Sequence, residues 1–177
     1  MAVAELVLVR SMRVLALFFA LLTVANASGY EHRVSGNGKF EAYTTPRWPD
    51  GTGMKVFLRR AQTRDEGVLL WQNDRWIKAR WSPDSRFLAL VSHPDGHISD
   101  VYVFGVTAAG RTAPPAATLL YHTPNPGTYD VQWEVVGWRL KTRSVILKKE
   151  FRFGVTRETI VAPIGTTPLK DITLDQT

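Results

Sequence analysis

Beyond residue 27, the chain has no stretch of ten or more residues whose apolar positions recur at helical spacing. Short runs rich in Val, Leu, Phe, Tyr and Trp recur instead, separated by clusters of Gly, Pro, Asn and Asp. Such runs favour strands, and the breakers between them allow the chain to reverse. The pattern predicts an all-β antiparallel up-and-down meander of about ten strands. We expect strands at residues 39–44, 54–60, 68–71, 76–81, 86–92, 100–106, 117–121, 129–136, 144–151 and 155–162.

The first 27 residues are typical of a secretory signal peptide. Arg10 and Arg13 form a positive start, residues 14–24 are apolar apart from Thr23, and residues 25–27 (ANA) suit signal peptidase. A transmembrane helix would need a longer run, of about 20 residues. We therefore expect a cleaved signal peptide at 1–27, a single all-β domain at 28–165 and a C-terminal tail at 166–177. The mature protein would be exported to the periplasm or the extracellular space and would not span the membrane.

The chain contains no cysteine, which excludes disulfides, thiolate catalysis and zinc sites that need sulfur. Small secreted domains often depend on disulfides. An exported domain without them suits a bacterial periplasm better than an animal extracellular fluid.

A repeat relates two parts of the chain. Residues 35–40 (SGNGKF) lie 47 positions before residues 82–87 (SPDSRF), and both combine a tight turn, a basic residue and an aromatic residue at the start of a strand. A strand that ends in Trp81 precedes the second turn, and a strand through Trp133 follows 52 positions later. A period of roughly 40–50 residues with about four strands per unit is typical of propeller blades.

The middle unit resembles a known family. Residues 81–90 (WSPDSRFLAL), followed by residues 99–104 (SDVYVF), are similar to the TolB-type β-propeller repeat over about 26 residues. Ser85 stands where that family prefers glycine, and residues 134–141 carry no trace of the turn. The resemblance implies blade geometry and protein partners, and it implies no reaction, because one fold serves many functions.

Three blade-like units fit in the chain, whereas a closed propeller usually needs at least four. In the middle unit, residues 87–91 and 101–104 are apolar at every position, so both faces of that sheet must be covered. In the last unit, Val145 and Leu147 alternate with Lys148 and Glu150. We expect a buried central layer between two half-solvated ones, open rather than closed into a ring.

The connections near residues 45–53, 72–75, 92–99 and 122–128 leave such a meander at the same end. Loops on a rigid scaffold often carry binding residues, although turns are also polar for structural reasons. The candidate binding residues at this end are Trp48, Asp74, Arg75, His93, Asp95, His97, His122 and Asn125.

Catalytic and metal-binding patterns are weak. His93, His97, Asp95 and Asp100 have zinc-binding atoms, but Pro94 and Gly96 prevent the helix that would align the two histidines. There is no Gly-x-Ser-x-Gly motif, and the glycine-rich segments lead into strands rather than helix N-termini. We therefore expect no catalytic residues, no metal and no cofactor.

A basic band in the first half of the chain resembles a nucleic-acid platform, because tryptophans 71, 76 and 81 lie nearby. Residues five apart on a strand point to opposite faces, however, and export argues against nucleic acid. We expect a solvated strand face or a contact with an anionic envelope component. The band consists of Arg59, Arg60, Arg64, Arg75, Lys78, Arg80 and Arg86.

Together these features predict an exported, non-catalytic interaction domain that binds a protein or an anionic cell-envelope component through loops at one end. Two alternatives remain open: a small-ligand or glycan-binding domain that uses Trp48 and the histidine loop, and a fragment of a propeller-type hydrolase. A homodimer that completes a ring of six units is a third arrangement for the same chain.

Overall fold

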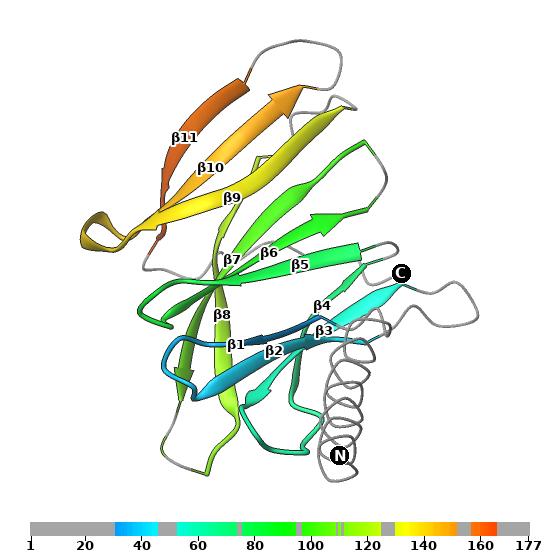
Figure 1. Ribbon diagram of the computed structural model, residues 1–177, viewed down its shortest axis with the longest axis vertical. Helices are drawn as coiled ribbons and strands as arrows, with labels where there is room; N and C mark the ends of the chain where they lie inside the picture. The colour runs from blue at the N-terminus through cyan, green and yellow to red at the C-terminus, as the bar shows by residue number, and fades with distance from the viewer. Residues whose placement is uncertain are drawn as a thin grey trace, which may run out of the picture. The chain divides into compact units, whose positions relative to one another are not determined.

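The computed structural model describes residues 31–45, 53–73, 76–94, 97–108, 110, 112–124, 130–151 and 157–165 (Figure 1). They form eleven strands in three antiparallel sheets of four, four and three strands, none closed into a barrel. The predicted all-β, open, blade-like architecture is therefore confirmed. The predicted signal peptide and C-terminal tail lie outside the described residues. In the part of the chain given above, no helix has the length and apolar character needed to cross a membrane.

The first sheet has the strand order β1-β2-β3-β4. Strand β1 is absent from the sequence prediction because its three residues are all exposed and show no apolar alternation. The strands are β1 (His32–Val34), β2 (Phe40–Thr44), β3 (Met54–Arg60) and β4 (Val68–Asn73).

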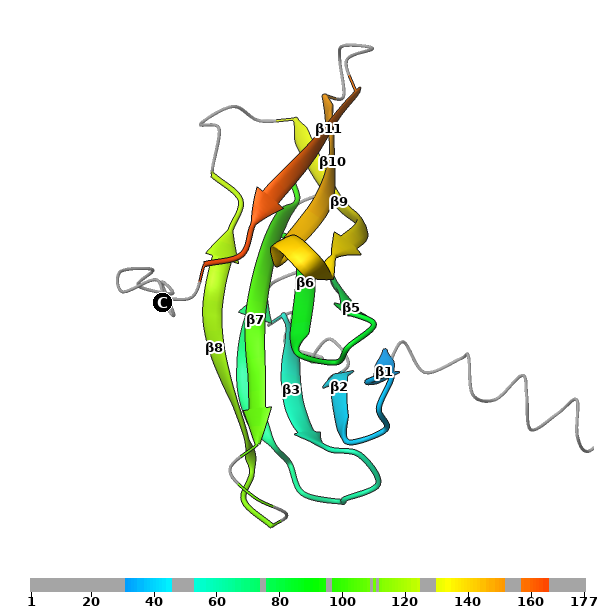
Figure 2. The ribbon, with the colours of Figure 1, turned by 90° about the vertical axis from the view of Figure 1, so that its left-hand side faces the viewer.

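The central sheet has the order β5-β6-β7-β8, and Figure 2 shows these strands in that order across the sheet. Strand β5 has the predicted bounds, whereas β7 and β8 extend further on both sides of their connection. Proline is tolerated at the start of β8 because it is the first residue of an edge strand. The strands are β5 (Trp76–Trp81), β6 (Phe87–His93), β7 (Asp100–Ala108) and β8 (Pro115–His122).

The third sheet has three strands in the order β11-β10-β9. A single 3-10 turn, η1 (Leu140–Thr142), joins β9 to β10, and Arg143 then adopts a left-handed conformation with φ of 47°. This connection differs from the serine-capped turn of the other two sheets, in agreement with the missing sequence motif. The strands are β9 (Val131–Arg139), β10 (Ser144–Phe151) and β11 (Arg157–Pro163).

The central sheet buries both of its faces. Leu88, Leu90 and Phe104 belong to one core cluster together with apolar residues of the first sheet. Ala89 and Val101 face the other way, into a second cluster with apolar residues of the third sheet. Leu88 is completely buried and Phe104 is 6% exposed, so the predicted two-sided cover is confirmed.

The outer sheets bury one face more completely than the other. In the third sheet, Val145 and Leu147 lie in the core, whereas Val136 and Val161 are more than a third exposed. In the first sheet, Leu58 and Leu70 lie in the core. Each outer sheet therefore covers one face of the central layer.

The repeated turns have the same hydrogen bonds. The Ser35 N–H donates to the Phe40 carbonyl at 2.8 Å, and the Ser82 N–H donates to the Phe87 carbonyl at 2.9 Å. The hydroxyl oxygen of each serine accepts the N–H of the aromatic residue five positions on, at 3.0 Å in both turns. The sequence repeat is thus a repeat of structure.

The two turns also contact each other. Gly38 and Ser85 occupy the same position in their turns, with left-handed φ of 69° and 60°. Glycine adopts this conformation at little cost, whereas serine does not. The Ser85 hydroxyl oxygen accepts the Asn37 N–H at 3.0 Å, a contact that a glycine could not make. This hydrogen bond offsets the backbone cost at Ser85.

Candidate ligand-binding cleft

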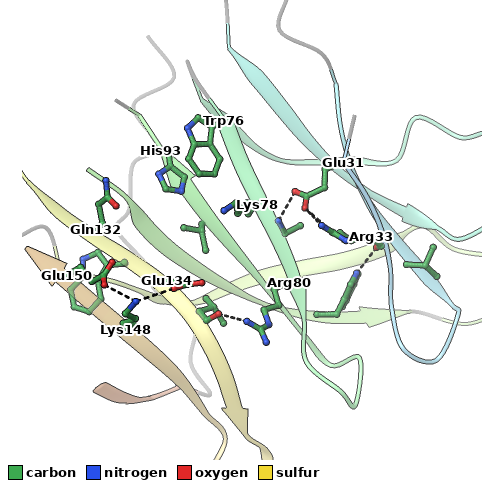
Figure 3. A pocket seen from close by; sticks show the side chains of 16 residues that line it. Glu31, Arg33, Trp76, Lys78, Arg80, His93, Gln132, Glu134, Lys148 and Glu150 are labelled. Carbon is green, nitrogen blue, oxygen red and sulfur yellow. Dashed lines mark hydrogen bonds and ion pairs between the residues drawn. The ribbon is translucent and has the colours of Figure 1, made fainter. Parts of the chain in front are cut away.

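A cleft of about 660 Å³ lies along strand β5, between β1 of the first sheet and β9 of the third (Figure 3). These are the first strands of the three sheets, and each is an edge strand. Ligand sites commonly have volumes of roughly 300–1,000 Å³. The cleft is therefore large enough for a small molecule or a short peptide segment.

The floor of the cleft is one face of β5. Trp76, Lys78 and Arg80 alternate with the buried Ile77 and Ala79, as expected for a strand with one covered face. In register, Lys78 pairs with Val91 and Arg80 pairs with Ala89 of β6. Those β6 residues pack against the third sheet, whereas the side chains of Lys78 and Arg80 remain exposed. The third sheet thus covers β6 and leaves the same face of β5 open.

Side chains link β5 to the backbone of both neighbouring edge strands. The Trp81 indole N–H donates to the Arg33 carbonyl at 2.7 Å, and the Arg80 guanidinium donates to the Val135 carbonyl. The Glu31 carboxylate accepts the Ala79 N–H at 3.1 Å. These bonds satisfy polar groups at sheet edges that could otherwise pair with another chain.

The three carboxylates that line the cleft all have partners. Glu31 pairs with Arg33 at 2.7 Å, and Lys148 lies 2.8 Å from Glu150 and 3.9 Å from Glu134. Arg157 also pairs with Glu150, and the hydrogen bond from Lys148 together with the charges of both cations lowers the pKa of that carboxyl. The acidic charge of the walls is thus balanced by Arg33, Lys148 and Arg157.

The two cations on the floor lack such partners. In the described residues, no carboxylate lies within ion-pair distance of Lys78 or Arg80. The Lys78 ammonium lies 4.9 Å from the centroid of the Trp76 ring instead. The floor therefore carries positive charge that the protein does not neutralise locally.

His93 holds the indole of Trp76 in place. The two rings stack with centroids 3.4 Å apart and an interplanar angle of 10°. Burial, with a smaller contribution from the nearby Lys78, lowers the pKa of His93 to about 4. His93 is therefore neutral near pH 7, and Trp76 remains 39% exposed as an aromatic surface.

Trp133 lines the cleft but is only 4% exposed. Its indole N–H is buried and has no hydrogen-bond partner among the described residues, as is also the case for Trp71 and Trp138. An indole N–H can only donate, and this one is not exposed to the cleft.

The structure separates the predicted loop residues that it describes. His93 and His122 lie at the same end of the central sheet but on opposite faces, since His122 stacks on Tyr102 of the first core cluster at 4.5 Å. His97 lies 3.8 Å from Asp130. Among these three histidines, only His93 lines the cleft. The other predicted residues, Trp48, Asp74, Arg75, Asp95 and Asn125, lie outside the described residues.

The surroundings of His122 are largely structural. Burial lowers the pKa of His122, and the Asp100 carboxylate opposes that effect. The pKa of Asp100 is itself raised by burial. Thr123 donates to Asp100 at 3.4 Å and accepts the Val101 N–H at 3.0 Å, which ties the end of β8 to β7. Over the residues given in the structure, no three His, Asp or Glu side chains are grouped so that they could hold a metal ion.

The predicted basic band does not form one surface. Arg59 pairs with Glu41 and Arg86 pairs with Asp84, while Arg60 binds backbone carbonyls at 110 and 113. Of the members of this band that the structure describes, only Lys78 and Arg80 line the cleft. The sequence predicts that Lys78 and Arg80 belong to a solvated strand face. The alternation of Trp76, Lys78 and Arg80 is the local signal that puts these three side chains on one face of the strand.

No protein-family model, curated protein or solved structure matches this chain. The resemblance of residues 81–106 to the TolB-type repeat therefore stays a prediction, and the functional argument depends on the cleft itself.

Proposed function

We propose that this protein is an exported, non-catalytic binding domain that takes an anionic ligand into the cleft along β5. The proposal depends on one observation: Lys78 and Arg80 on the floor have no carboxylate partner, while every carboxylate that lines the cleft has one. An anionic ligand would supply the missing charge. Charge-assisted hydrogen bonds are roughly twice as strong as neutral ones, so this charge gives specificity as well as attraction.

The other groups of the cleft support binding rather than a reaction. Trp76 is 39% exposed and offers apolar contact area. His93 is stacked and neutral near pH 7, and the carboxylates are held in ion pairs. None of these groups is arranged as a nucleophile beside a base. Export follows from the predicted signal peptide and is part of the proposal.

The proposed site in the cleft is not the loop surface that the sequence predicts, although His93 belongs to both. An anionic cell-envelope component or an acidic protein remains the predicted class of partner. In this proposal, strand β5 recognises that partner.

Titration of the purified protein with poly-L-glutamate, polygalacturonate and uncharged dextran tests the proposal by calorimetry. We expect an anionic polymer to bind in a salt-sensitive manner and dextran not to bind. Lys78→Glu should weaken binding by about tenfold or more, because it reverses the charge on the floor. Lys39→Glu makes the same charge change at an exposed turn outside the cleft and should change affinity by less than about threefold. Equal losses in the two variants, or no binding of either anionic polymer, would contradict the proposal.

A further inference from the structure

We infer that the ligand of this cleft is an extended acidic segment of a polypeptide that carries carboxylates on alternate residues. The inference rests on the proposed anion-binding function and names the class of ligand. Three features of the cleft support it.

The first feature is the spacing of the floor residues. Trp76, Lys78 and Arg80 project from alternate positions of β5, and alternate positions of a strand are about 6.6 Å apart. An extended peptide presents its own side chains at the same interval. Acidic residues at two alternate positions, with an apolar residue two positions further on, would lie opposite the two cations and the indole.

The second feature is the set of hydrogen bonds that β5 makes to the chain segments on either side of it. Its side chains donate to backbone carbonyls of Arg33 and Val135 on either side, and its backbone donates from Ala79 to the carboxylate of Glu31. The strand thus binds both backbone carbonyls and an acidic side chain of its own chain. An added acidic segment would use the same groups: the remaining guanidinium N–H donors of Arg80 and the ammonium of Lys78.

The third feature favours a peptide over an acidic polysaccharide. A sugar ring binds an indole by stacking on its face, and Trp76 already stacks on His93. His93 stacks on the ring with centroids 3.4 Å apart, and the Lys78 ammonium lies 4.9 Å from its centroid. The exposed part of the indole can contact an apolar side chain without displacing either group.

The test compares defined probes on the purified protein by calorimetry and by the NMR signal of the Trp76 indole. One probe is a blocked seven-residue peptide with leucine and two glutamates at alternate positions, supplied in both sequence directions. A second peptide has the same composition with its two glutamates adjacent, and a third probe is tetragalacturonate. We expect one alternating peptide to shift the Trp76 signal and to bind at least tenfold more tightly than the adjacent peptide and the saccharide.

Charge exchange makes the test specific for the cleft. Lys78→Glu should lose at least tenfold in affinity for the alternating peptide, and Lys39→Glu should not. A peptide in which lysine replaces the glutamate that faces position 78 should recover affinity for Lys78→Glu and lose it for the unmodified protein. This reciprocal result cannot come from a variant that has failed to fold.

Three results would overturn the inference in different ways. Tight, Lys78-dependent binding of tetragalacturonate with peptides no better would leave the anion-binding function standing and reject the peptide. If no probe shifts the Trp76 signal or responds to Lys78→Glu, both the inference and the proposed function are wrong. Equal binding of the alternating and adjacent peptides would reject the spacing argument alone and with it the extended ligand.

Discussion

Strands β5, β6 and β7 belong to one sheet, and their side chains point alternately to the same two faces. What covers those faces differs between β5 and the other two strands. In β6, both faces are buried, and Ala89 and Val91 pack against the third sheet. In β5, the residues on that same face, Lys78 and Arg80, are exposed to the cleft. The inner strands of the central layer are covered on both faces, whereas the edge strand β5 keeps one face open for the proposed binding site.

The largest effect should come from a truncation in the covered part of the central sheet. Leu88→Ala leaves a cavity at a side chain with no solvent exposure, so we expect a loss of about 3–4 kcal/mol in the free energy of unfolding. Urea denaturation measures it. Lys78→Ala, at the open edge of the same sheet, should change stability by no more than about 0.5 kcal/mol. Similar losses for the two variants would remove the distinction between interior and edge.

The next effect concerns the turn that joins β5 to β6. Ser82→Ala removes the acceptor of the buried Phe87 N–H and the hydroxyl that donates to Asp84 at 2.6 Å. We expect a loss of about 1–2 kcal/mol. Ser35→Ala is the matched variant in the first sheet, because its hydroxyl accepts the Phe40 N–H in the same way. Unfolding curves that show no loss for either serine would contradict the account of the repeat.

A pH effect of about 1 kcal/mol should arise at the edge strand. Burial and Lys78 lower the pKa of His93 to about 4, below its ordinary value of 6.5, so the unfolded chain binds this proton more readily. Stability is therefore unaffected above pH 6.5 and falls as the pH drops from 6.5 toward 4. Each pH unit is worth at most about 1.4 kcal/mol, and less for a ring that is only half buried.

His93→Gln isolates this contribution, because a second histidine with a lowered pKa, His122, titrates in the same direction on the other face of the sheet. Thermal unfolding at pH 7 and pH 5 should show a smaller acid destabilisation in the variant than in the unmodified protein. Parallel pH curves would show that His93 is not buried by Trp76.

The smallest effect is expected where two opposing terms nearly cancel. Ser85→Gly relieves a left-handed serine but removes the hydroxyl that accepts the Asn37 N–H, so the free energy of unfolding should change by no more than about 0.5 kcal/mol. Ser85→Ala loses the hydrogen bond and keeps the strain, and it should cost about 1 kcal/mol. If Ser85→Gly is strongly destabilising, the hydrogen bond between the two turns is worth more than the strain.

Local patterns in the sequence were sufficient for much of the fold. The two-sided apolar character of residues 87–91 required cover on both faces, and the motifs at 35–40 and 82–87 indicated equivalent turns. Both depend only on neighbouring residues. Strand β1 was missed because its exposed residues have no alternation, and it gains its structure from pairing with β2.

The cleft could not be predicted in the same way. Nothing near Lys78 and Arg80 in the sequence records how far the third sheet extends over the central one. The separation of His93 from His122 has a similar cause: a register shift between Val103 and Phe104 in the pairing of β7 with β8 changes which side chains share a face. Alternation within one strand does not reveal such a shift.

One row of the central sheet tests the main conclusion most directly. Lys78, Val91 and Val101 are paired in register across β5, β6 and β7 and lie on the same face. Because the chain has no cysteine, Lys78→Cys, Val91→Cys and Val101→Cys each introduce a single thiol whose labelling rate can be measured in the native protein. We expect rapid labelling at position 78 and labelling slower by about 100-fold or more at positions 91 and 101, where access requires local unfolding. A thiol at 78 as protected as that at 101, or one at 101 as reactive as that at 78, would contradict the open edge beside a covered interior.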